Sequence, residues 1–464
     1  MADSNIRSDK ASCHDVYLYQ IESEMRLFNQ TKLLFALIIF LWSCKEDQPR
    51  ELISTKTYSA DVAYKWMELT REMVKFTPGF TPPVSARAFG YLGITLYESV
   101  VPGMGDHVSL TNQLNDFKTG PQVDLYHVYD WRLSANSASA SILRQLFSTA
   151  PANILSKIDS LETSIQSEIY PALDAEIISR SENFGKAVAI HVHEYSTTDG
   201  GDQGQTRNFP ANYIVPNGVG FWTPTSSQLI PLQPYWGQNR AFTSVKNLVP
   251  ATKVPYSEVV GSAFYAQALE VYSAVNSLSA EGKEVALYWS DDPGIAGTPA
   301  GHSISIASQV IKREKLNLAK AVRLYAQMGI ALNDAFISCW KCKYTFNLLR
   351  PVSYINKLID PNWKTVLNTP PFPEFTSGHS VQTAAAAVVL ENAVGSSYNF
   401  VDSTHAQRED IGRPVRSYNS FNEMAFEAAL SRLYGGIHFR EAIEVGINQG
   451  RAIGGGAIRL RWLK

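Results

Sequence analysis

The sequence lacks a basic excess, a cysteine framework and a long apolar segment, and each absence excludes a class of protein. Its 41 Lys and Arg against 43 Asp and Glu give a net charge of −2, so no positive field favours nucleic acid as a partner. Its four cysteines are too few for a disulfide framework and too scattered for a four-thiolate zinc site. Cys339 and Cys342 form a Cys-x-x-Cys pair, which we expect to be two buried thiols on a helix rather than a redox pair.

An apolar run at residues 33–42 is too short to cross a bilayer about 30 Å thick as a helix. Its length suits the core of an export signal, and the serine and Cys44 that follow it resemble a bacterial lipoprotein cleavage site. Residues 1–44 are therefore interpreted as an over-extended start plus a signal peptide that begins at Met25, with Cys44 as the lipid anchor to the outer membrane. The charged residues 45–47 resemble a sorting tag, so we expect an exported protein that is periplasmic or surface-exposed. The alternative is a buried N-terminal helix.

Apolar residues make up 45% of the chain, with 22 Tyr, 21 Phe and 9 Trp, which indicates a well-filled globular interior. These residues recur at helical spacing, and few segments show the alternation of β-strands. The sequence predicts an all-α fold of two packed helical bundles, an N-terminal region at 45–256 and a catalytic bundle at 257–464 that carries the functional site. The expected helices span residues 59–75, 84–100, 131–149, 152–170, 173–196, 257–277, 279–289, 303–313 and 316–340.

Between residues 197 and 255 the helical period disappears, and Gly, Pro, Asn and aromatic residues take over. A loop of this length in a compact domain is usually functional or a tether. Its aromatic content predicts that it packs onto the body as a cover, where it would form the active-site entrance or a dimer contact.

Three short clusters in the C-terminal part carry residue types suited to binding an oxyanion. The first holds two cations with six residues between them, and a proline fixes a bend after the second. The second is a Ser-Gly-His loop at the start of an Ala-rich helix, where backbone N–H groups and the positive end of the helix dipole would face an anion. The third pairs an arginine with a histidine. The residues are Lys343 and Arg350, then Ser377, Gly378 and His379, then Arg432 and His438.

In this order and spacing, the patterns Lys-x6-Arg-Pro, Ser-Gly-His and Ser-Arg-x5-His resemble the shared signature of the type 2 phosphatidic acid phosphatase superfamily. That superfamily unites class A bacterial acid phosphatases, lipid phosphatases and vanadium-dependent haloperoxidases. Thr376 departs from the pattern, since the family usually has proline before the serine, but the change removes no anion ligand.

The resemblance implies an anion, vanadate in the haloperoxidases, and a role for each residue of the signature. These roles are charge neutralisation for Lys343, Arg350 and Arg432, hydrogen-bond donation for Ser377 and Gly378, the bond to the central atom for His438, and general acid–base chemistry for His379.

Flanking residues favour the haloperoxidases within this superfamily. Trp340 and Phe372 stand where chloroperoxidase-type members carry the same aromatics near the halide site, although both could equally be core residues. The chain is longer than a class A phosphatase bundle and lacks the membrane spans of the lipid phosphatases. We therefore predict a vanadate-dependent haloperoxidase that oxidises halide with hydrogen peroxide to a hypohalous species. The alternative is a soluble acid phosphatase that hydrolyses phosphate monoesters through a phosphohistidine at His438. Both readings require small-molecule substrates, and both are compatible with an oligomer.

Further contacts are expected around this site. His302 follows a Pro-x-Gly step and is predicted to line the pocket, the alternative being a capping or core role. Asp291 or Asp292 could pair with Arg350, although tandem acids before Pro-Gly more often form turns.

A glutamate after His438 is expected to bind its other ring nitrogen, as carboxylates do for many ligating histidines. Of Glu441 and Glu444, Glu441 has the better helical geometry because it lies three residues on.

Overall fold

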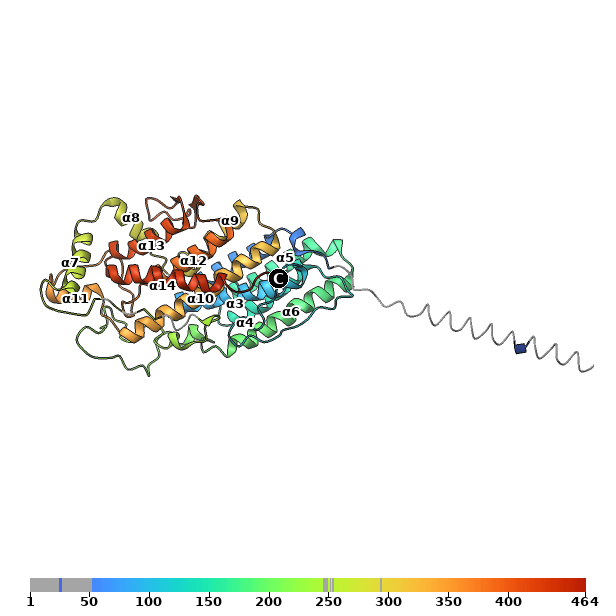
Figure 1. Ribbon diagram of the computed structural model, residues 1–464, viewed down its shortest axis with the longest axis horizontal. Coiled ribbons are helices and arrows are strands. Elements are labelled where there is room, and N and C mark those ends of the chain that lie inside the picture. The colour runs from blue at the N-terminus through green and yellow to red at the C-terminus, as the bar shows by residue number, and fades with distance from the viewer. Residues whose placement is uncertain (1–24, 27–51, 245–248, 251, 253, 293) are drawn as a thin grey trace, which may run out of the picture. The chain divides into compact units, whose positions relative to one another are not determined.

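The computed structural model describes residues 25–26, 52–244, 249–250, 252, 254–292 and 294–464. Residues 27–44 of the expected signal peptide, which include Cys44, and the sorting tag at 45–47 lie outside the described residues. Residues 52–124 together with 128–464 form one compact unit (Figure 1), and the account below concerns this unit. Among the described residues, no helix combines the length and the apolarity needed to cross a membrane.

Helices build most of the unit, which confirms the all-α prediction. They are α2 Asp61–Phe76, α3 Pro82–Glu98, α4 Trp131–Leu146, α5 Ala152–Ile169, α6 Ala175–Thr197, α7 Ala263–Asn276, α8 Ala280–Tyr288, α9 Thr298–Arg313, α10 Leu318–Phe346, α11 Pro351–Leu358, α12 Gly378–Val394, α13 Phe421–Tyr434 and α14 Arg440–Ile458. Short 3-10 turns lie at Thr55–Thr57, Val101–Gly103, Tyr170–Ala172, Gly204–Thr206 and Trp236–Gln238. Two three-residue strands, β1 Phe400–Asp402 and β2 Arg416–Tyr418, pair antiparallel.

Local sequence explains where the helices that carry the site begin. The side chain of Asn317 accepts a hydrogen bond from the backbone of Lys320 and caps α10, and Ser377 caps α12 in the same way. Arg350 adopts an extended conformation, with φ −79° and ψ 153°, because Pro351 follows it at the start of α11. The helix before this bend runs to Phe346, six residues beyond the expected end at Trp340, so Lys343 lies in its last turn.

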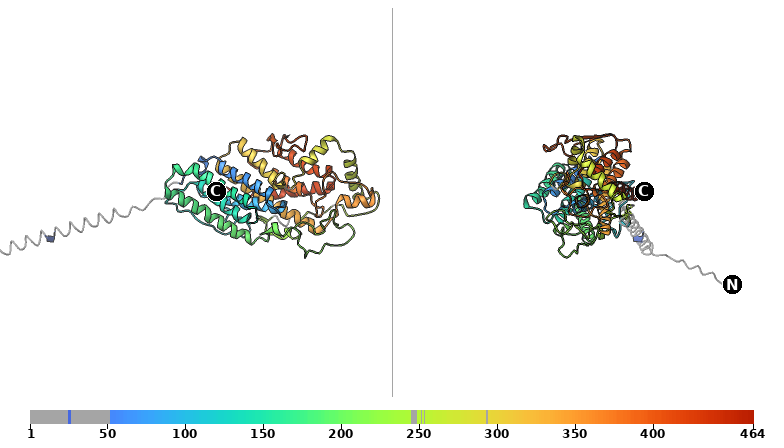
Figure 2. Two further views of the ribbon diagram at one scale, coloured as in Figure 1. Left: turned by 180° about the vertical axis from the view of Figure 1, so that it is seen from behind. Right: turned by 90° about the vertical axis from the view of Figure 1, so that its left-hand side faces the viewer.

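Helix α10 is buried along nearly its whole length and packs against α3 on one side and against α12 and α14 on another (Figures 1 and 2). Glycines permit the close approach to α3, since a Cβ at Gly329 would lie 2.8 Å from the Cα of Gly90. A Cβ at Gly450 of α14 would lie 2.1 Å from the carbonyl oxygen of Val381 in α12. The largest hydrophobic core runs through α2–α6, α8–α10 and α12–α14, and a second one joins α7 and α11 to α12–α14. The division into two bundles near residue 256 stays a prediction.

The long loop packs onto the body, as expected for a cover. At its start, Asp199 accepts hydrogen bonds from the side chains of Arg87 at 2.7 Å and Tyr91 at 2.8 Å. Near residue 243, Asp334 of α10 accepts from the backbone N–H and the hydroxyl of Thr243 at 2.9 and 2.7 Å. Buried carboxylates therefore fix the loop at two points. The predicted dimer contact stays untested.

Cys339 and Cys342 lie on α10, and both are buried free thiols within the described part of the chain. This agrees with the expectation of two buried side chains on one helix. Burial raises the pKa of both thiols, that of Cys342 to about 12, which suppresses thiolate chemistry.

Candidate functional site

A cavity of about 330 Å³ opens at the end of the bundle where α10, α12 and α13 deliver their signature residues. Gly378, His379, Arg432 and His438 line it. Lys343, Arg350 and Ser377 are not part of the lining and lie next to it. Arg350 contacts His438, and Lys343 bonds to the backbone just before Ser377, so the three sequence clusters meet although up to 95 positions separate their members.

Two guanidinium groups at this cavity are buried with part of their hydrogen-bonding capacity unused. Arg350 donates from Nε to the carbonyl of Phe372 and from Nη1 to that of Ile437, both at 2.8 Å. Arg432 donates from Nη1 to the carbonyl of Trp289. Arg350 Nη2 and Arg432 Nε find no partner among the described residues. Burial lowers the pKa of each arginine to about 10, so both remain charged at neutral pH, and an oxyanion is the kind of group that would accept from the unused donors.

Lys343 contributes charge rather than a free donor. Its ammonium group is fully buried and donates to the carbonyls of Pro373, Glu374 and Thr376 at 3.0, 3.0 and 2.6 Å. These three bonds use all the protons that a lysine carries. Burial lowers the pKa of Lys343 to about 8. The lysine therefore fixes the loop before Ser377 and adds positive charge beneath the cavity.

The start of α12 supplies backbone donors to the same place. Ser377 caps the helix, and a Cβ at Gly378 would meet, within 4 Å, a single side-chain atom of Trp340 at 3.8 Å. An anion can therefore approach the backbone N–H groups at the positive end of the helix dipole. Thr376 points elsewhere, since its hydroxyl donates to Gln449 at 2.6 Å. Thr376, the residue that departs from the usual proline, is not part of the cavity lining.

His438 is held as a neutral imidazole with a defined tautomer. Its Nδ1 lies 2.7 Å from the Oε1 of Glu374, which also accepts from the N–H of Phe439 at 2.9 Å. A carboxylate at Nδ1 places the proton there, so Nε2 keeps its lone pair and accepts from Arg350 Nη1 at 3.2 Å. Burial and the charge of Arg350 lower the pKa of His438 well below its usual value.

The expectation that Glu441 orients His438 is wrong. The Glu441 carboxylate accepts from the backbone of Val254 at 3.2 Å, and the partner of His438 is Glu374. Glu374 lies 64 positions upstream in a proline-rich loop, where helical spacing gives no information. Burial raises the pKa of Glu374 to about 7.

His379 faces the cavity with a ring that is 15% exposed, while its Nε2 is buried. That nitrogen lies 3.7 Å from Oδ2 of Asp291, and neither atom has a hydrogen-bond partner in the described ranges. Burial and the charge of Arg432 lower the pKa of His379 to about 4, so the ring is neutral near pH 7. A neutral imidazole at the cavity wall has the properties of a general base.

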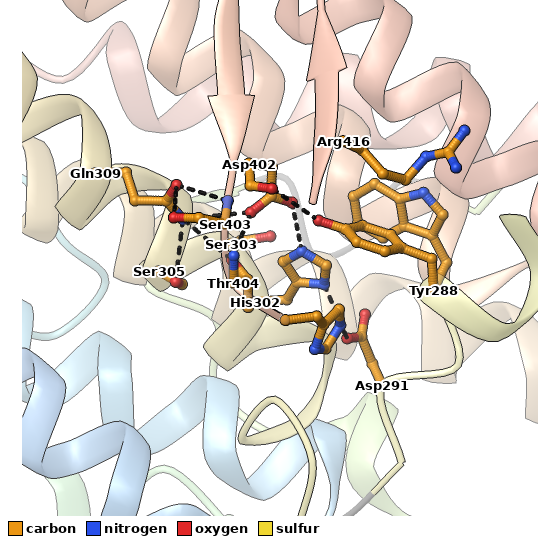
Figure 3. Close-up of polar contacts among 12 residues, drawn as sticks. Tyr288, Asp291, His302, Ser303, Ser305, Gln309, Asp402, Ser403, Thr404 and Arg416 are labelled. Atoms are coloured by element: carbon orange, nitrogen blue, oxygen red, sulfur yellow. Dashed lines mark hydrogen bonds and ion pairs between the residues drawn. The ribbon is translucent and has the colours of Figure 1, made fainter. Parts of the chain in front are cut away.

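The predicted pocket position of His302 and the predicted pairing of Asp291 with Arg350 are both wrong. His302 is fully buried behind the cavity wall, with Nδ1 2.8 Å from Asp291 and Nε2 2.7 Å from Asp402 (Figure 3). Asp291 thus contacts histidines instead of Arg350. Asp292 lines the cavity. Burial raises the pKa of Asp292, and the nearby positive charge of Arg432 offsets only part of this rise.

Aromatic side chains form part of the cavity wall, as expected from their positions in the sequence. The rings of Trp340 and Phe372 lie 5.1 Å apart, and Phe372 lies under two cations, 5.0 Å from Lys343 Nζ and 4.9 Å from Arg350 Cζ. The long loop adds Phe209 and Leu232 to the same wall. The cavity therefore has buried cations on one side and apolar side chains on the other.

Comparison with known proteins gives consistent relatives. Residues 323–461 match the family model described as the VCPO second helical-bundle domain. Vanadium chloroperoxidase from Curvularia inaequalis is 26% identical over 212 residues, a match that covers 33% of this chain and 35% of that enzyme. The chain thus matches about a third of the length of this curated relative.

Solved structures extend the likeness to nearly the whole chain. A bacterial vanadium-dependent iodoperoxidase is 34% identical, with a TM-score of 0.79, over 88% of this chain and 97% of that one. A holo-type bacterial vanadium-dependent chloroperoxidase is 14% identical, with a TM-score of 0.62, over 83% and 93%, and supports the fold alone.

Proposed function

The chain belongs to the vanadium-dependent haloperoxidases, and we propose that it binds vanadate in the cavity at His438 and oxidises halide with hydrogen peroxide to a hypohalous species. The observation that carries the proposal is a pair of buried guanidiniums, Arg350 and Arg432, each with an N–H that is unpartnered within the described part of the chain. Buried donors of this kind are costly unless an anion completes them.

The donor set fits a vanadate oxyanion. Arg350 Nη2, Arg432 Nε and the N–H of Gly378 would bond its oxygens, the hydroxyl of Ser377 would add a donor, and the charge of Lys343 would act from below. His438 Nε2 would bind the central atom, because Glu374 keeps the proton on Nδ1. When bound, vanadate supplies a Lewis-acid centre that activates hydrogen peroxide toward attack by halide.

His379 is proposed as the group that takes the peroxide proton. A proton on Nε2 would face Asp291 Oδ2, which leaves Nδ1 as the basic atom of the ring. Once Nδ1 is protonated, the imidazolium would lie beside the carboxylate of Asp291, which stabilises the charge. The same proton can later pass to the oxygen that leaves with the halogen.

The apolar wall is proposed to select for a weakly hydrated halide. Trp340, Phe372, Phe209 and Leu232 offer few hydrogen bonds to a solvated anion, and they exclude water from the reacting groups. The relative that shares 34% identity is an iodoperoxidase. Because iodide is also the most easily oxidised of the common halides, we propose it as a substrate of this chain.

The proposal is tested by assaying purified protein with and without orthovanadate, in parallel, for peroxide-dependent oxidation of iodide, bromide and chloride and for hydrolysis of p-nitrophenyl phosphate. We expect vanadate-dependent oxidation, with iodide the fastest halide. Phosphate-ester hydrolysis that vanadate inhibits, with no oxidation of any halide, would overturn the proposal in favour of the phosphatase reading.

A further inference from the structure

A second buried polar cluster lies directly behind the cavity wall and is centred on His302 of α9. Its ring stands between two carboxylates, with Nδ1 2.8 Å from Asp291 Oδ1 and Nε2 2.7 Å from Asp402 Oδ2. Asp291 lies in the loop before α9, and Asp402 ends β1. All three side chains are at most 2% exposed. Figure 3 shows the imidazole bridging the two acids.

The contacts of this cluster define its charge state. An ionised carboxylate only accepts hydrogen bonds, so a ring bonded to one at each nitrogen must donate from both. The second oxygen of Asp402 accepts from the N–H and the hydroxyl of Thr404 at 2.9 and 2.6 Å, which favours the ionised acid. Burial opposes a charge on His302, but Asp291 and Asp402 together raise its pKa to about 10. The ring is therefore an imidazolium across the neutral pH range.

We propose that the imidazolium of His302, held by Asp402, positions Asp291 for the reaction at His379. This inference rests on the proposed haloperoxidase function and adds His302 and Asp402 as positioning residues. His302 fixes Asp291 Oδ1, and the ring of His405 approaches the same oxygen at 3.3 Å. The other oxygen of Asp291, Oδ2, makes no hydrogen bond within the described residues and lies 3.7 Å from His379 Nε2. The charge of His302 also holds the pKa of Asp291 well below its usual range against the effect of burial, so the group facing His379 is an anion.

The cluster also contacts Trp289, which is hydrogen-bonded to Arg432 of the proposed vanadate site. The ring of Trp289 stacks on His302 with centroids 4.5 Å apart and planes 18° apart, an arrangement that stabilises a cation. The backbone carbonyl of the same tryptophan accepts the hydrogen bond from Arg432 Nη1. Two further rings contact His302, that of Tyr288 with centroids 5.7 Å apart and that of His405 with centroids 4.8 Å apart. His302 thus supports both the proposed base and one of the proposed vanadate ligands.

A metal ion is the competing occupant, because ligand atoms of Asp291, His302 and His405 lie within 4.8 Å of one another. Metal binding needs a lone pair on each imidazole. Both nitrogens of His302 are committed to carboxylates at hydrogen-bond distance. The geometry therefore favours a proton over a metal, and the experiment below includes this alternative.

The charge of His302 is measured directly by NMR on the vanadate-loaded protein labelled with ¹⁵N-histidine. We expect one ring with both nitrogens protonated, with shifts that do not change between about pH 6 and 8. A neutral ring at His302, or one that titrates in this range, overturns the proposal. A stoichiometric divalent metal in the purified protein that is lost in His405→Ala overturns it as well. These results do not depend on whether the protein oxidises halide, so they stand apart from a failure of the proposed function.

The positioning role is measured with Asp402→Asn, which removes a charge at a residue outside the cavity lining. We expect kcat for iodide oxidation to fall about tenfold, while the Kd for vanadate changes less than about threefold. The matched control is Thr404→Val, which removes a hydroxyl bond to the other oxygen of Asp402 and leaves the contact with His302. Wild-type kcat in vanadate-loaded Asp402→Asn, or an equal fall in both variants, would contradict the role. If Asp402→Asn does not fold, the NMR measurement on the unaltered protein still decides the charge.

Discussion

Two buried polar clusters meet at Asp291, and the cations at their centres differ in how many of their hydrogen bonds are made. The first cluster surrounds the cavity at His438 and is called the anion pocket. In it, Arg350 and Arg432 each keep one N–H without a partner in the described part of the chain. In the cluster behind it, both nitrogens of His302 are bonded to carboxylates. A buried donor without a partner costs free energy, and a buried ring bonded at both nitrogens is held rigidly. The difference separates a site that an external anion must complete from a network that supports it.

The largest effect is expected at His438, the proposed ligand of the vanadium atom. His438→Ala removes the Nε2 lone pair and should abolish halide oxidation, by about a thousandfold or more in kcat. The assay is peroxide-dependent iodide oxidation with saturating vanadate. His193→Ala, a histidine on α6 outside the cavity lining, serves as the control and should retain wild-type activity. Turnover that survives in His438→Ala would mean that the central ligand is another residue.

The next effect tests whether the unpartnered N–H of Arg432 serves vanadate binding rather than the stability of the vanadate-free protein. Arg432→Met removes an unpartnered buried donor and one bond to a carbonyl, so the Kd for vanadate should rise about a hundredfold. The free energy of unfolding without vanadate should change by less than about 1 kcal/mol, since removing the desolvation cost of the buried charge offsets the lost bond to the Trp289 carbonyl and the lost attraction to Asp291 and Asp292. Isothermal titration and urea unfolding measure the two quantities. An unchanged Kd, or a large loss of stability without vanadate, would remove the distinction between the two clusters.

A smaller effect is expected from the carboxylate that orients His438. Glu374→Gln replaces the acceptor at Nδ1 with an amide and should raise the Kd for vanadate about tenfold. Glu441→Gln is the matched control, because its carboxylate contacts the backbone of Val254 rather than His438. Equal effects of the two substitutions would argue that Glu374 acts through general charge and not through its bond to the ring.

The last effect concerns His302 in the cluster behind the cavity and depends on pH. The folded pKa of His302, about 10, exceeds its usual value of 6.5, so its stabilisation is fully present below pH 6.5 and is lost as pH rises through 10. The stability difference between the unaltered protein and His302→Asn should therefore shrink by about 1.4 kcal/mol per pH unit between pH 7 and 9. Urea unfolding of the vanadate-free proteins measures it. A difference that stays constant over this range would mean that His302 is neutral in the folded state.

The features predicted correctly from the sequence are those that depend on residues close together in the chain. Helical periodicity located α2 to α10 with ends mostly within a few residues. Of the signature residues, Gly378, His379, Arg432 and His438 line the cavity, and Arg350 contacts His438 from beside it. A loop rich in aromatic residues was expected to act as a cover, and Phe209 and Leu232 do line the cavity.

The missed contacts join distant segments that have no periodic relation. Glu374 reaches His438 across 64 positions, and Asp402 reaches His302 across 100. Acids in a proline-rich loop and in a three-residue strand carry no sequence signal for their partners, because the fold alone brings them together. Helical spacing instead favoured Glu441, whose side chain turns to another segment.

The central claim is that vanadate completes the anion pocket and switches on halide oxidation. Vanadate-free protein titrated with orthovanadate, in the presence of hydrogen peroxide and iodide, tests it most directly. We predict no oxidation at the start, a linear rise in rate, and a plateau at one vanadate per chain. A rate that does not depend on vanadate, or vanadate binding that brings no oxidation of any halide, would contradict it.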